Sequence, residues 1–463
     1  TGGYAVNTMP LQSNISGLTH DVGFGGDVVV DHRGDLDVSG ATSVGILGVS
    51  AAGGASADGS QGNAFMGSDA ASVTIDQYGT IDVTGTRVVG IAALSVGSGG
   101  LVHNVTSDSF VNGATDVATN TAVLGEYIYN SPGICRECDA VLGDAQFNDT
   151  PGSADGAAVT VTNYPGAAVS VGNGDGTSQI ALGIVAQSIG SAGGLVMGPG
   201  SWFHGSKGGA GGNGGTVTVT NWGTVSTVAN RNLSDGAYAG AVGILAQSIG
   251  GGGGAGGSAK GLFVAVGGSG GDGGHGGTVT VDMNKPDAKL VTSGDYAMGI
   301  IAHSIGGGGG HGGGAAAFSF KASIPATTVG GSGGKGGNGG SVNVTSAGTF
   351  TTMGEQAHGI VLQSIGGGGG TGGAAHSGGF SAGISTSVAI GGSGKAAGDG
   401  GSVTAKLGSG SQFITRANDS SAVVMQSIGG GGGLGGSALA KSMAIGLGTF
   451  DPELESVPTL TAT

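Results

Sequence analysis

The sequence predicts an all-β protein, a parallel β-solenoid in which repeats carry glycine-rich excursions. Two observations predict this class. A strand-forming block recurs seven times along the 463 residues, and 112 residues are glycine, many in runs with a three-residue period. Glycine loses more conformational freedom on folding than any other residue, so ordered glycine runs require regular packing against neighbours. The periodicity therefore favours a stacked architecture over a flexible linker.

The composition of the chain limits the kinds of protein it can be. Hydrophobic residues make up 38% of the chain, which is enough for a core, whereas charged residues make up only 9%. The net charge of -15 argues against nucleic-acid binding, because phosphate contacts require clustered Lys and Arg. The sequence contains no apolar run of about 18 residues, so we expect no membrane-spanning helix. The chain begins at Thr1 without a signal peptide, and we interpret it as a mature product or an excised piece.

Each repeat opens with a strand in which apolar and polar residues alternate. In residues 216–220, Val217 and Val219 point to one face and the flanking threonines point to the other. The seven openings are "DVVVD" at 27, "SVTID" at 72, "AVTVT" at 158, "TVTVT" at 216, "TVTVD" at 278, "SVNVT" at 341 and "SVTAK" at 402.

A turn and a second short strand follow, as in "NWGTVST" at 221–227. The third block, such as "GILAQSIG" at 243–250, is apolar on both faces and predicts a strand that is covered on both sides. Because the glycine-rich excursion comes next in the chain, we expect it to pack back over this third strand.

The excursions show the triplet period most clearly in "GGSGGDGGHGGT" at 267–278. Three residues per turn is typical of the polyproline II helix, which has no internal hydrogen bonds. We expect residues 267–277 and 330–340 to lie side by side with their backbones bonded. The apolar stretches "GLFVAV" at 261–266 and "FSFKAS" at 318–323 are expected to pair in the same stack.

The blocks "VTVTNWGTVST" and "GILAQSIGGGGGAGG" resemble passenger regions of bacterial autotransporters of the glycine-rich, outer-membrane β-barrel group. The resemblance extends over about residues 25 to 450. It implies a right-handed parallel β-helix exposed at the cell surface, commonly adhesive, that is exported through a C-terminal membrane barrel. The sequence divides into degenerate N-terminal repeats (1–102), an insertion with a CxxC motif (103–155), regular glycine-rich repeats (156–450) and a C-terminal tail or linker (451–463).

One polar position recurs in the third strands. It predicts a structural ladder in which stacked side-chain amides bond along the sheet. The ladder residues are Gln187, Gln247, His303, Gln363 and Gln426. A zinc site of His303 with His275 and His311 is an alternative, if these side chains converge.

The insertion contributes two further predictions. Cys135 and Cys138 form a CxxC pair, which can be half a zinc site, a redox pair or a small disulfide loop, and we predict the disulfide. The aromatic residues of the insertion indicate a possible binding loop, and the alternative is an insertion or capping element without a binding role. These residues are Phe110, Tyr127, Tyr129 and Phe147.

The sequence predicts a non-enzymatic extracellular scaffold that mediates adhesion or surface display, without a cofactor. The expected partner is a component of a host or neighbouring cell surface, or a further copy of the chain. Alternatives are a self-assembling fibre subunit, a polysaccharide-processing enzyme, and an ice-binding solenoid whose outward threonines include Thr160, Thr218 and Thr280.

Overall fold

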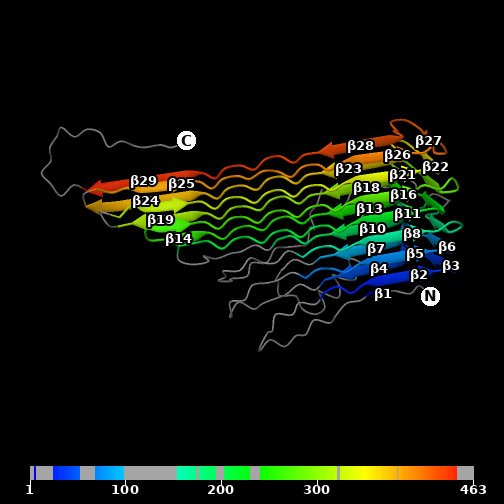
Figure 1. Ribbon diagram of the computed structural model, residues 1–463, viewed down its shortest axis with the longest axis horizontal. Coiled ribbons are helices and arrows are strands. Elements are labelled where there is room, and N and C mark those ends of the chain that lie inside the picture. The colour runs from blue at the N-terminus through cyan, green and yellow to red at the C-terminus, as the bar shows by residue number, and fades with distance from the viewer. Residues whose placement is uncertain are drawn as a thin grey trace, which may run out of the picture.

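The computed structural model describes residues 5–6, 24–52, 68–97, 154–173, 177–193, 203–229, 240–320, 324–382 and 384–445. Within these ranges all regular elements are β-strands, in agreement with the predicted all-β class. The same ranges hold no helix of the length and hydrophobicity needed to cross a membrane. Figure 1 shows the strands stacked side by side, with the chain progressing from one end of the stack to the other.

The alternating strands that open the repeats form a seven-stranded parallel sheet, the first sheet, with one strand from each repeat. Val217 lies opposite Val159 in the preceding repeat and opposite Val279 in the next, so equivalent side chains stack in columns. The strands, in order, are β2 (Val28–His32), β5 (Val73–Gln77), β8 (Val159–Asn163), β11 (Val217–Asn221), β16 (Val279–Met283), β21 (Val342–Ser346) and β26 (Val403–Leu407).

The second short strands form another seven-stranded parallel sheet, the second sheet, which also takes one strand from each repeat. They are β3 (Asp35–Ser39), β6 (Thr80–Thr84), β9 (Ala168–Val171), β12 (Thr224–Val228), β17 (Lys289–Ser293), β22 (Thr349–Met353) and β27 (Gln412–Arg416).

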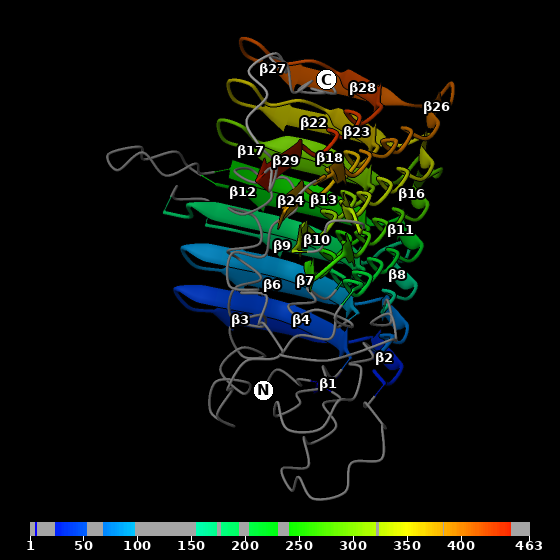
Figure 2. The same cartoon turned by 90° about the vertical axis from the view of Figure 1, so that its left-hand side faces the viewer.

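The third blocks form the third sheet, an eight-stranded sheet that β1 (Ala5–Val6) extends at one edge. Figure 2 shows the repeats stacked in chain order from blue to red, so that their strands form the three sheets. The remaining strands are β4 (Thr42–Ala51), β7 (Arg87–Val96), β10 (Ile180–Ile189), β13 (Gly240–Ile249), β18 (Met298–Ile305), β23 (Ile360–Ile365) and β28 (Val423–Ile428). We call the three sheets together the body, an arrangement compatible with the predicted β-solenoid.

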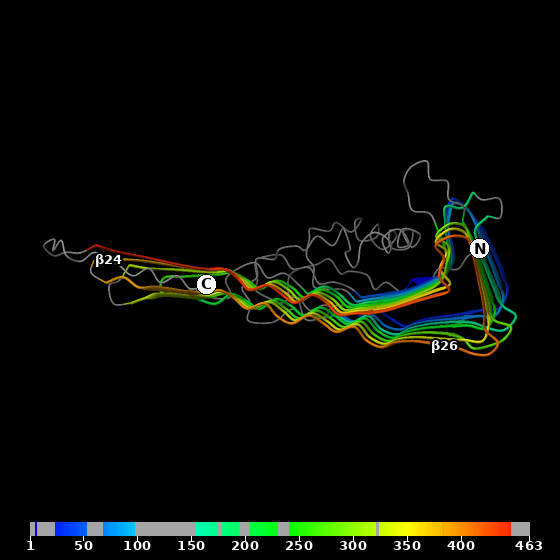
Figure 3. The same ribbon diagram turned by 90° about the horizontal axis from the view of Figure 1, so that it is seen from above.

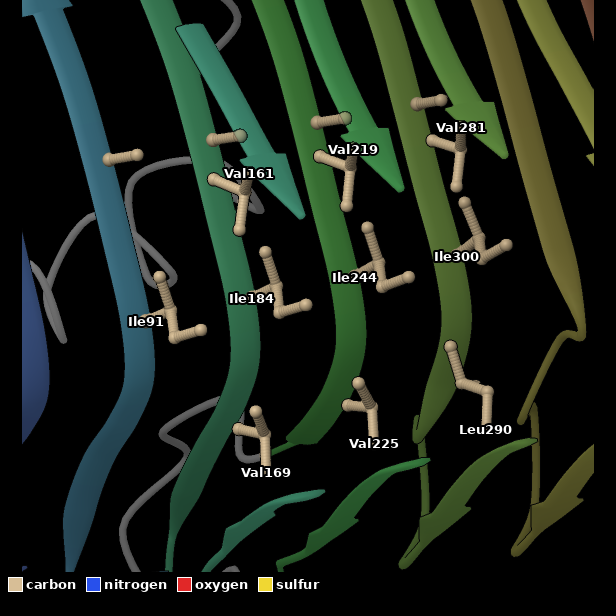
Figure 4. Close-up of a cluster of buried hydrophobic side chains, with 14 of the residues drawn as sticks. Ile91, Val161, Val169, Ile184, Val219, Val225, Ile244, Val281, Leu290 and Ile300 are labelled. Carbon is tan, nitrogen blue, oxygen red and sulfur yellow. The ribbon is translucent and has the colours of Figure 1, made fainter. Parts of the chain in front are cut away.

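The core of the body consists mainly of columns of aliphatic side chains that point between the three sheets. Ile244 is fully buried and lies opposite Ile184 and Ile300 of the neighbouring repeats. Figure 4 shows this isoleucine column beside a valine column from the first sheet and a column of valine and leucine from the second. A single repeat cannot bury its own apolar face, so stacking makes the core continuous.

Repeats on both sides of the predicted insertion pair directly with each other. β5 pairs with β8, β6 with β9 and β7 with β10, without a change of register. Of the insertion predicted at 103–155, the structure describes only Ala154 and Asp155. The repeat stack therefore continues past the insertion in phase.

Glycine arms project from the third and first sheets. Outgoing runs follow the third strands β13, β18, β23 and β28 (residues 250–258, 306–314, 366–374 and 429–437), and returning runs lead to the first-sheet strands β11, β16, β21 and β26 (205–216, 267–278, 330–341 and 391–402). Figure 3 shows that these runs form two adjacent layers that extend away from the body. For these runs, the expectation that the excursions pack back over the third strand is therefore wrong. The backbone partners of the glycines lie both in the other run of the same arm and in neighbouring arms, as the bonds of Gly271 to Gly254 and of Gly270 to Ser332 show. The full set of bonds therefore forms only where arms lie side by side.

Each glycine triplet bonds in two directions. The amide of Gly270 donates to the carbonyl oxygen of Ser332 in the next returning run, at 2.8 Å. The amide of Gly271 donates to the carbonyl oxygen of Gly254 in the outgoing layer, also at 2.8 Å. Together with the bonds from Gly273 and Gly276 to the run at 330–340, this confirms the predicted backbone pairing of the two returning runs.

The arms end in a tip whose described strands form two sheets, one in each layer. Residues 261–266 therefore do not pair with 318–323 as one strand: Gly261 lies opposite Ala317, whereas Val264 lies opposite Thr327. Leu262 and Phe263 form the connection between the two strands. The tip strands are β14 (Ala259–Gly261), β19 (Ala315–Ser319), β24 (Ala375–Ala382) and β29 (Ala438–Ile445) in one sheet, and β15 (Val264–Val266), β20 (Ala326–Val329) and β25 (Ser387–Ile390) in the other.

Candidate functional site

The recurring amides lie in one column on the face of the third sheet that points away from the core. Gln187 Nε2 donates to Gln247 Oε1 at 2.7 Å, and Gln247 Nε2 lies 3.3 Å from His303 Nδ1. Further along, Gln363 Nε2 donates to Gln426 Oε1 at 2.5 Å. The parallel register places equivalent residues of successive repeats opposite each other, which brings these side chains together.

Burial changes along this column. Gln187 and Gln247 are buried, His303 and Gln363 are half-buried, and Gln426 is exposed. Burial lowers the pKa of His303 to about 4, so the imidazole is neutral near neutral pH. A neutral imidazole can accept the amide hydrogen of Gln247 at Nδ1. Its Nε2 atom is one of the buried polar atoms without a hydrogen-bond partner among the described residues.

A second column, of serines, joins the third strands to the returning runs. Ser304 Oγ donates to the carbonyl oxygen of Gly277 at 2.7 Å and accepts the amide hydrogen of Gly340 at 2.7 Å. Ser248 makes the same two bonds one repeat earlier, to Gly215 and Gly277. Each hydroxyl therefore links two successive returning runs at the point where the arms leave the body.

This serine column was not predicted from the sequence, although serine recurs more regularly than the amides. Serine occupies the position in all seven repeats, whereas Val49 and Leu94 replace the amide in the first two. The serines are Ser50, Ser95, Ser188, Ser248, Ser304, Ser364 and Ser427. Six of the seven are fully buried, which explains why a small residue that can both donate and accept recurs here.

The histidines considered for zinc are each bound elsewhere. His275 Nδ1 accepts the amide hydrogen of Asn338 at 2.8 Å, and His311 Nδ1 lies 2.6 Å from Thr371 Oγ1. His303 contacts Gln247. The described residues contain no group of three or more His, Cys, Asp or Glu side chains placed to hold a metal. The structure therefore does not bring the three histidines together.

His275 belongs to a third polar column, on the outer edge of the returning runs. Asp155 Oδ1 accepts the amide hydrogen of Asn213 at 2.7 Å, and Asn213 Oδ1 accepts that of His275 at 2.8 Å. Asn338 Oδ1 accepts the amide hydrogen of Asp399 at 2.9 Å. In this column the side chain of one repeat thus bonds the backbone of the next repeat, which is a structural role.

Aromatic residues stack at the corner between the first and second sheets. Tyr78 and Tyr164 are parallel, with ring centroids 4.0 Å apart, and Trp222 meets Tyr164 edge-on at 6.1 Å. Arg33 lies 4.3 Å from the centroid of Tyr78, and Lys285 lies 5.3 Å from that of Trp222. The side-chain hydrogen bond with Tyr78 is the main cause that raises the pKa of Tyr164 to about 12. Both ends of the stack are capped by cations, so this column supports the corner.

The tip has only small residues in its interior. Between its two sheets, Ala265 is fully buried and packs with Ala259, Ala315 and Ala317. The buried residues of the described tip strands are Ala259, Ala265, Ala315, Ala317, Ser319, Ala326, Thr328, Ala375, Ser377, Gly379 and Ser381. Such side chains let two sheets approach closely but bury little apolar area.

Large apolar side chains lie on the outside of the tip. Phe320 is 68% exposed and Ile384 is 75% exposed, both beside the connections between the two layers. Of the exposed large hydrophobic residues in the described structure, most belong to the tip or its flanks: Phe203, Leu262, Val264, Phe318, Phe320, Phe380, Ile384, Val388, Ile390, Leu439, Met443 and Ile445. This reverses the usual distribution, in which large apolar residues lie inside. Exposed apolar patches are typical of interaction surfaces, so the outside of the tip is a candidate site.

The remaining predicted site residues lie outside the described part of the chain: Cys135, Cys138, Phe110, Tyr127, Tyr129 and Phe147. The disulfide and the binding loop stay predictions. Comparison of the chain with protein-family models, curated proteins and solved structures finds no match.

Proposed function

We propose that this chain is a non-enzymatic adhesive scaffold of the bacterial cell surface, an autotransporter passenger region built as a right-handed parallel β-solenoid. In this proposal the glycine arms are stacked polyproline II helices that carry the tip outward as the contact surface. One observation carries the proposal. Large apolar side chains gather on the outside of the tip, at the end of arms held together by backbone hydrogen bonds.

The arms suit the display of a surface because their packing leaves no room for rearrangement. A Cβ atom added to Gly271 would lie 1.8 Å from the carbonyl oxygen of Gly209, and one added to Gly307 would lie 1.9 Å from that of Gly251. Backbones this close stabilise one another through regular hydrogen bonds and offset the entropy cost of ordering glycine. A stiff arm keeps the tip away from the body and limits the entropy lost on binding.

Adhesion can be tested with beads that carry the full chain, washed over layers of cultured cells and over bacterial layers. We expect more beads to be retained than with an inert protein coat. The triple variant Phe318→Ser, Phe380→Ser and Val388→Ser should reduce retention, because it removes apolar side chains from both tip sheets. A matched variant, Val29→Ser, Met353→Ser and Leu407→Ser, removes exposed apolar side chains from the body and should adhere normally. Retention no better than that of the inert coat on every surface would refute the adhesive function.

A self-assembling fibre is the second candidate, favoured by charge. Within the described strands, β2 and β26 are the edge strands of the first sheet. If a second copy continued the repeat register, Lys406 of one copy would lie opposite Asp31 of the next, since both belong to one column of equivalent positions. Opposite charges on directly paired strand residues stabilise pairing. If the chain forms fibres, electron microscopy should show filaments. Lys406→Glu should shorten the filaments, and the double variant Lys406→Glu with Asp31→Lys should restore their length.

A further inference from the structure

The charge of the tip and of the adjoining parts of the arms differs from that of the rest of the chain. The whole sequence has 29 acidic and 14 basic residues, yet residues 249–271, 304–334 and 364–398 contain no Asp or Glu. Lys260 and Lys441 are exposed on the tip strands β14 and β29. The tip and the parts of the arms next to it, within these ranges, therefore carry lysines but no acidic side chain.

The lysines and the large apolar side chains share a face of the four-stranded tip sheet. Lys260 lies opposite Ala316, and Phe318 is on the same face two residues further along β19. Lys441 lies opposite Gly378, and Phe380 follows on the same face of β24. Because side chains alternate along a strand, cations and aromatic rings are next to each other on this surface.

Apolar side chains also cover the opposite side of the tip. Val388 and Ile390 are exposed on β25 in the three-stranded sheet, and Leu262 is exposed where the two layers connect. Figure 3 shows that the two layers remain adjacent to the end of the arms. A folded protein partner would cover one of these faces. A fluid amphiphilic layer into which the tip inserts would cover both faces and the connecting edge.

We propose that the tip inserts into the surface of a lipid bilayer that carries anionic headgroups. Phe318, Phe380 and Val388 enter the boundary between headgroups and acyl chains, and Lys260 and Lys441 contact the headgroup phosphates. Apolar burial together with attraction of lysines to anionic lipid is the usual basis of interfacial binding. A second copy of the tip is a less suitable partner for this surface, because it would place the lysines of one copy against those of the other with no acidic side chain between them. The proposal rests on the proposed adhesive function and specifies its partner.

The test measures co-sedimentation of the full chain with vesicles of phosphatidylcholine alone and with added phosphatidylglycerol, alongside protein without vesicles. We expect binding to the anionic vesicles, weaker binding to the neutral ones and no sedimentation of the protein alone. Raising the salt concentration should weaken the anionic component, because headgroup attraction is screened.

Two sets of substitutions separate the contributions. Lys260→Gln with Lys441→Gln should lower partitioning onto anionic vesicles roughly 30-fold and leave neutral vesicles unaffected. The apolar tip variant Phe318→Ser, Phe380→Ser and Val388→Ser should lose binding to both kinds of vesicle. The matched body variant Val29→Ser, Met353→Ser and Leu407→Ser should bind like the unmodified chain.

Besides failure of the chain to bind either kind of vesicle, three results would overturn the inference. The first is equal binding to neutral and anionic vesicles, and the second is an equal loss of vesicle binding in the tip and body variants. The third is sedimentation of the protein without vesicles that the tip variant abolishes, which would identify a second copy of the chain as the occupant. Hydrogen exchange of the glycine amides shows whether the arms of each variant are intact. If beads adhere to cells while vesicles stay unbound, the adhesive function stands and the lipid partner is wrong.

Discussion

The body and the glycine arms use the same repeat stacking but are held together by different groups. In the body, fully buried side chains such as Ile184, Ile244 and Ile300 form columns between the sheets. In the arms, most close contacts are between backbones, and carbonyl oxygens lie where a Cβ would otherwise be. The hydrophobic effect therefore stabilises the body, whereas regular backbone hydrogen bonding stabilises the arms.

The comparison also separates two kinds of glycine within the arms. At Gly307 an added Cβ would lie 1.9 Å from a carbonyl oxygen, but at Gly308 the nearest such atom is 3.8 Å away. Positions in phase with Gly308 hold His311, Thr371 and Leu434 in the same layer. Two glycines of each triplet are thus required by packing, and the third position accepts a side chain.

The largest expected effect is in the arms. Replacing Gly270, Gly271, Gly273 and Gly274 with alanine places methyl groups against backbone oxygens of both layers. Overpacking of this kind costs about 1–3 kcal/mol per site, so we expect at least about 4 kcal/mol in total. Thermal unfolding with hydrogen exchange of the arm amides measures the loss. An unchanged or raised midpoint would show that the arms do not pack as described.

A smaller loss is expected in the body. Ile244→Ala leaves a cavity in a continuous aliphatic column, and such changes cost about 2–5 kcal/mol. Denaturant unfolding should show this loss. Hydrogen exchange then tests whether the arms are stabilised independently of the body. If they are, arm amides far from Ile244 should keep their protection from exchange until the body unfolds. Early loss of protection throughout the arms would contradict the idea that the arms hold themselves together.

The serine column joins the two regions, so its substitution should affect both. Ser304→Ala removes a donor to Gly277 and an acceptor for the amide of Gly340. Leaving buried backbone groups unsatisfied costs about 1–3 kcal/mol. The exposed Ser402, which bonds the Ser341 hydroxyl, is the matched control, and Ser402→Ala should change stability by less than about 0.5 kcal/mol. Equal effects of the two substitutions in denaturant unfolding would argue against the serine column.

His303 makes part of the body's stability depend on pH. Its pKa is lowered from 6.5 to about 4 in the folded state, so the unfolded chain binds the proton more readily. Stability should therefore fall as pH drops from 6.5 to about 4, by up to about 1.4 kcal/mol per pH unit, and this contribution is constant outside that window. His303→Gln restores the amide of the other repeats. The difference in unfolding free energy between the two proteins, measured across this window, should favour the variant at low pH; a difference independent of pH would contradict the assignment.

The smallest effect is expected at the open positions of the arms. Gly308→Ala meets no close atom and restricts the unfolded chain, so it should be neutral or stabilising by up to about 1 kcal/mol. Gly307→Ala, one residue away, should destabilise the protein. If thermal unfolding gave the same midpoint shift for both, the distinction between required and free glycines would fail.

Much of the architecture was predictable because it depends on short-range periodicity. Alternation in residues such as Val217 and Thr218 predicts strands and their inward faces, and the spacing of the repeats predicts which strands are equivalent. The triplet phase of Ser269, Asp272 and His275 likewise predicts that glycine pairs face neighbouring backbones. These features depend on residues only a few positions apart in the chain, and local sequence patterns are informative at that range.

Only the tertiary structure decided the direction of the arms and the composition of the tip. A glycine triplet has the same period whether its arm folds back over the third strand or extends away from it, and the choice depends on partners such as Gly271 and Gly310, far apart in sequence. Likewise, the alternation of Phe318 with Ala317 defines two faces of a strand but not which face is buried. Here the close approach of two sheets admits only the small residues, so the large ones lie outside, and the lysines of distant repeats, Lys260 and Lys441, come to share one surface.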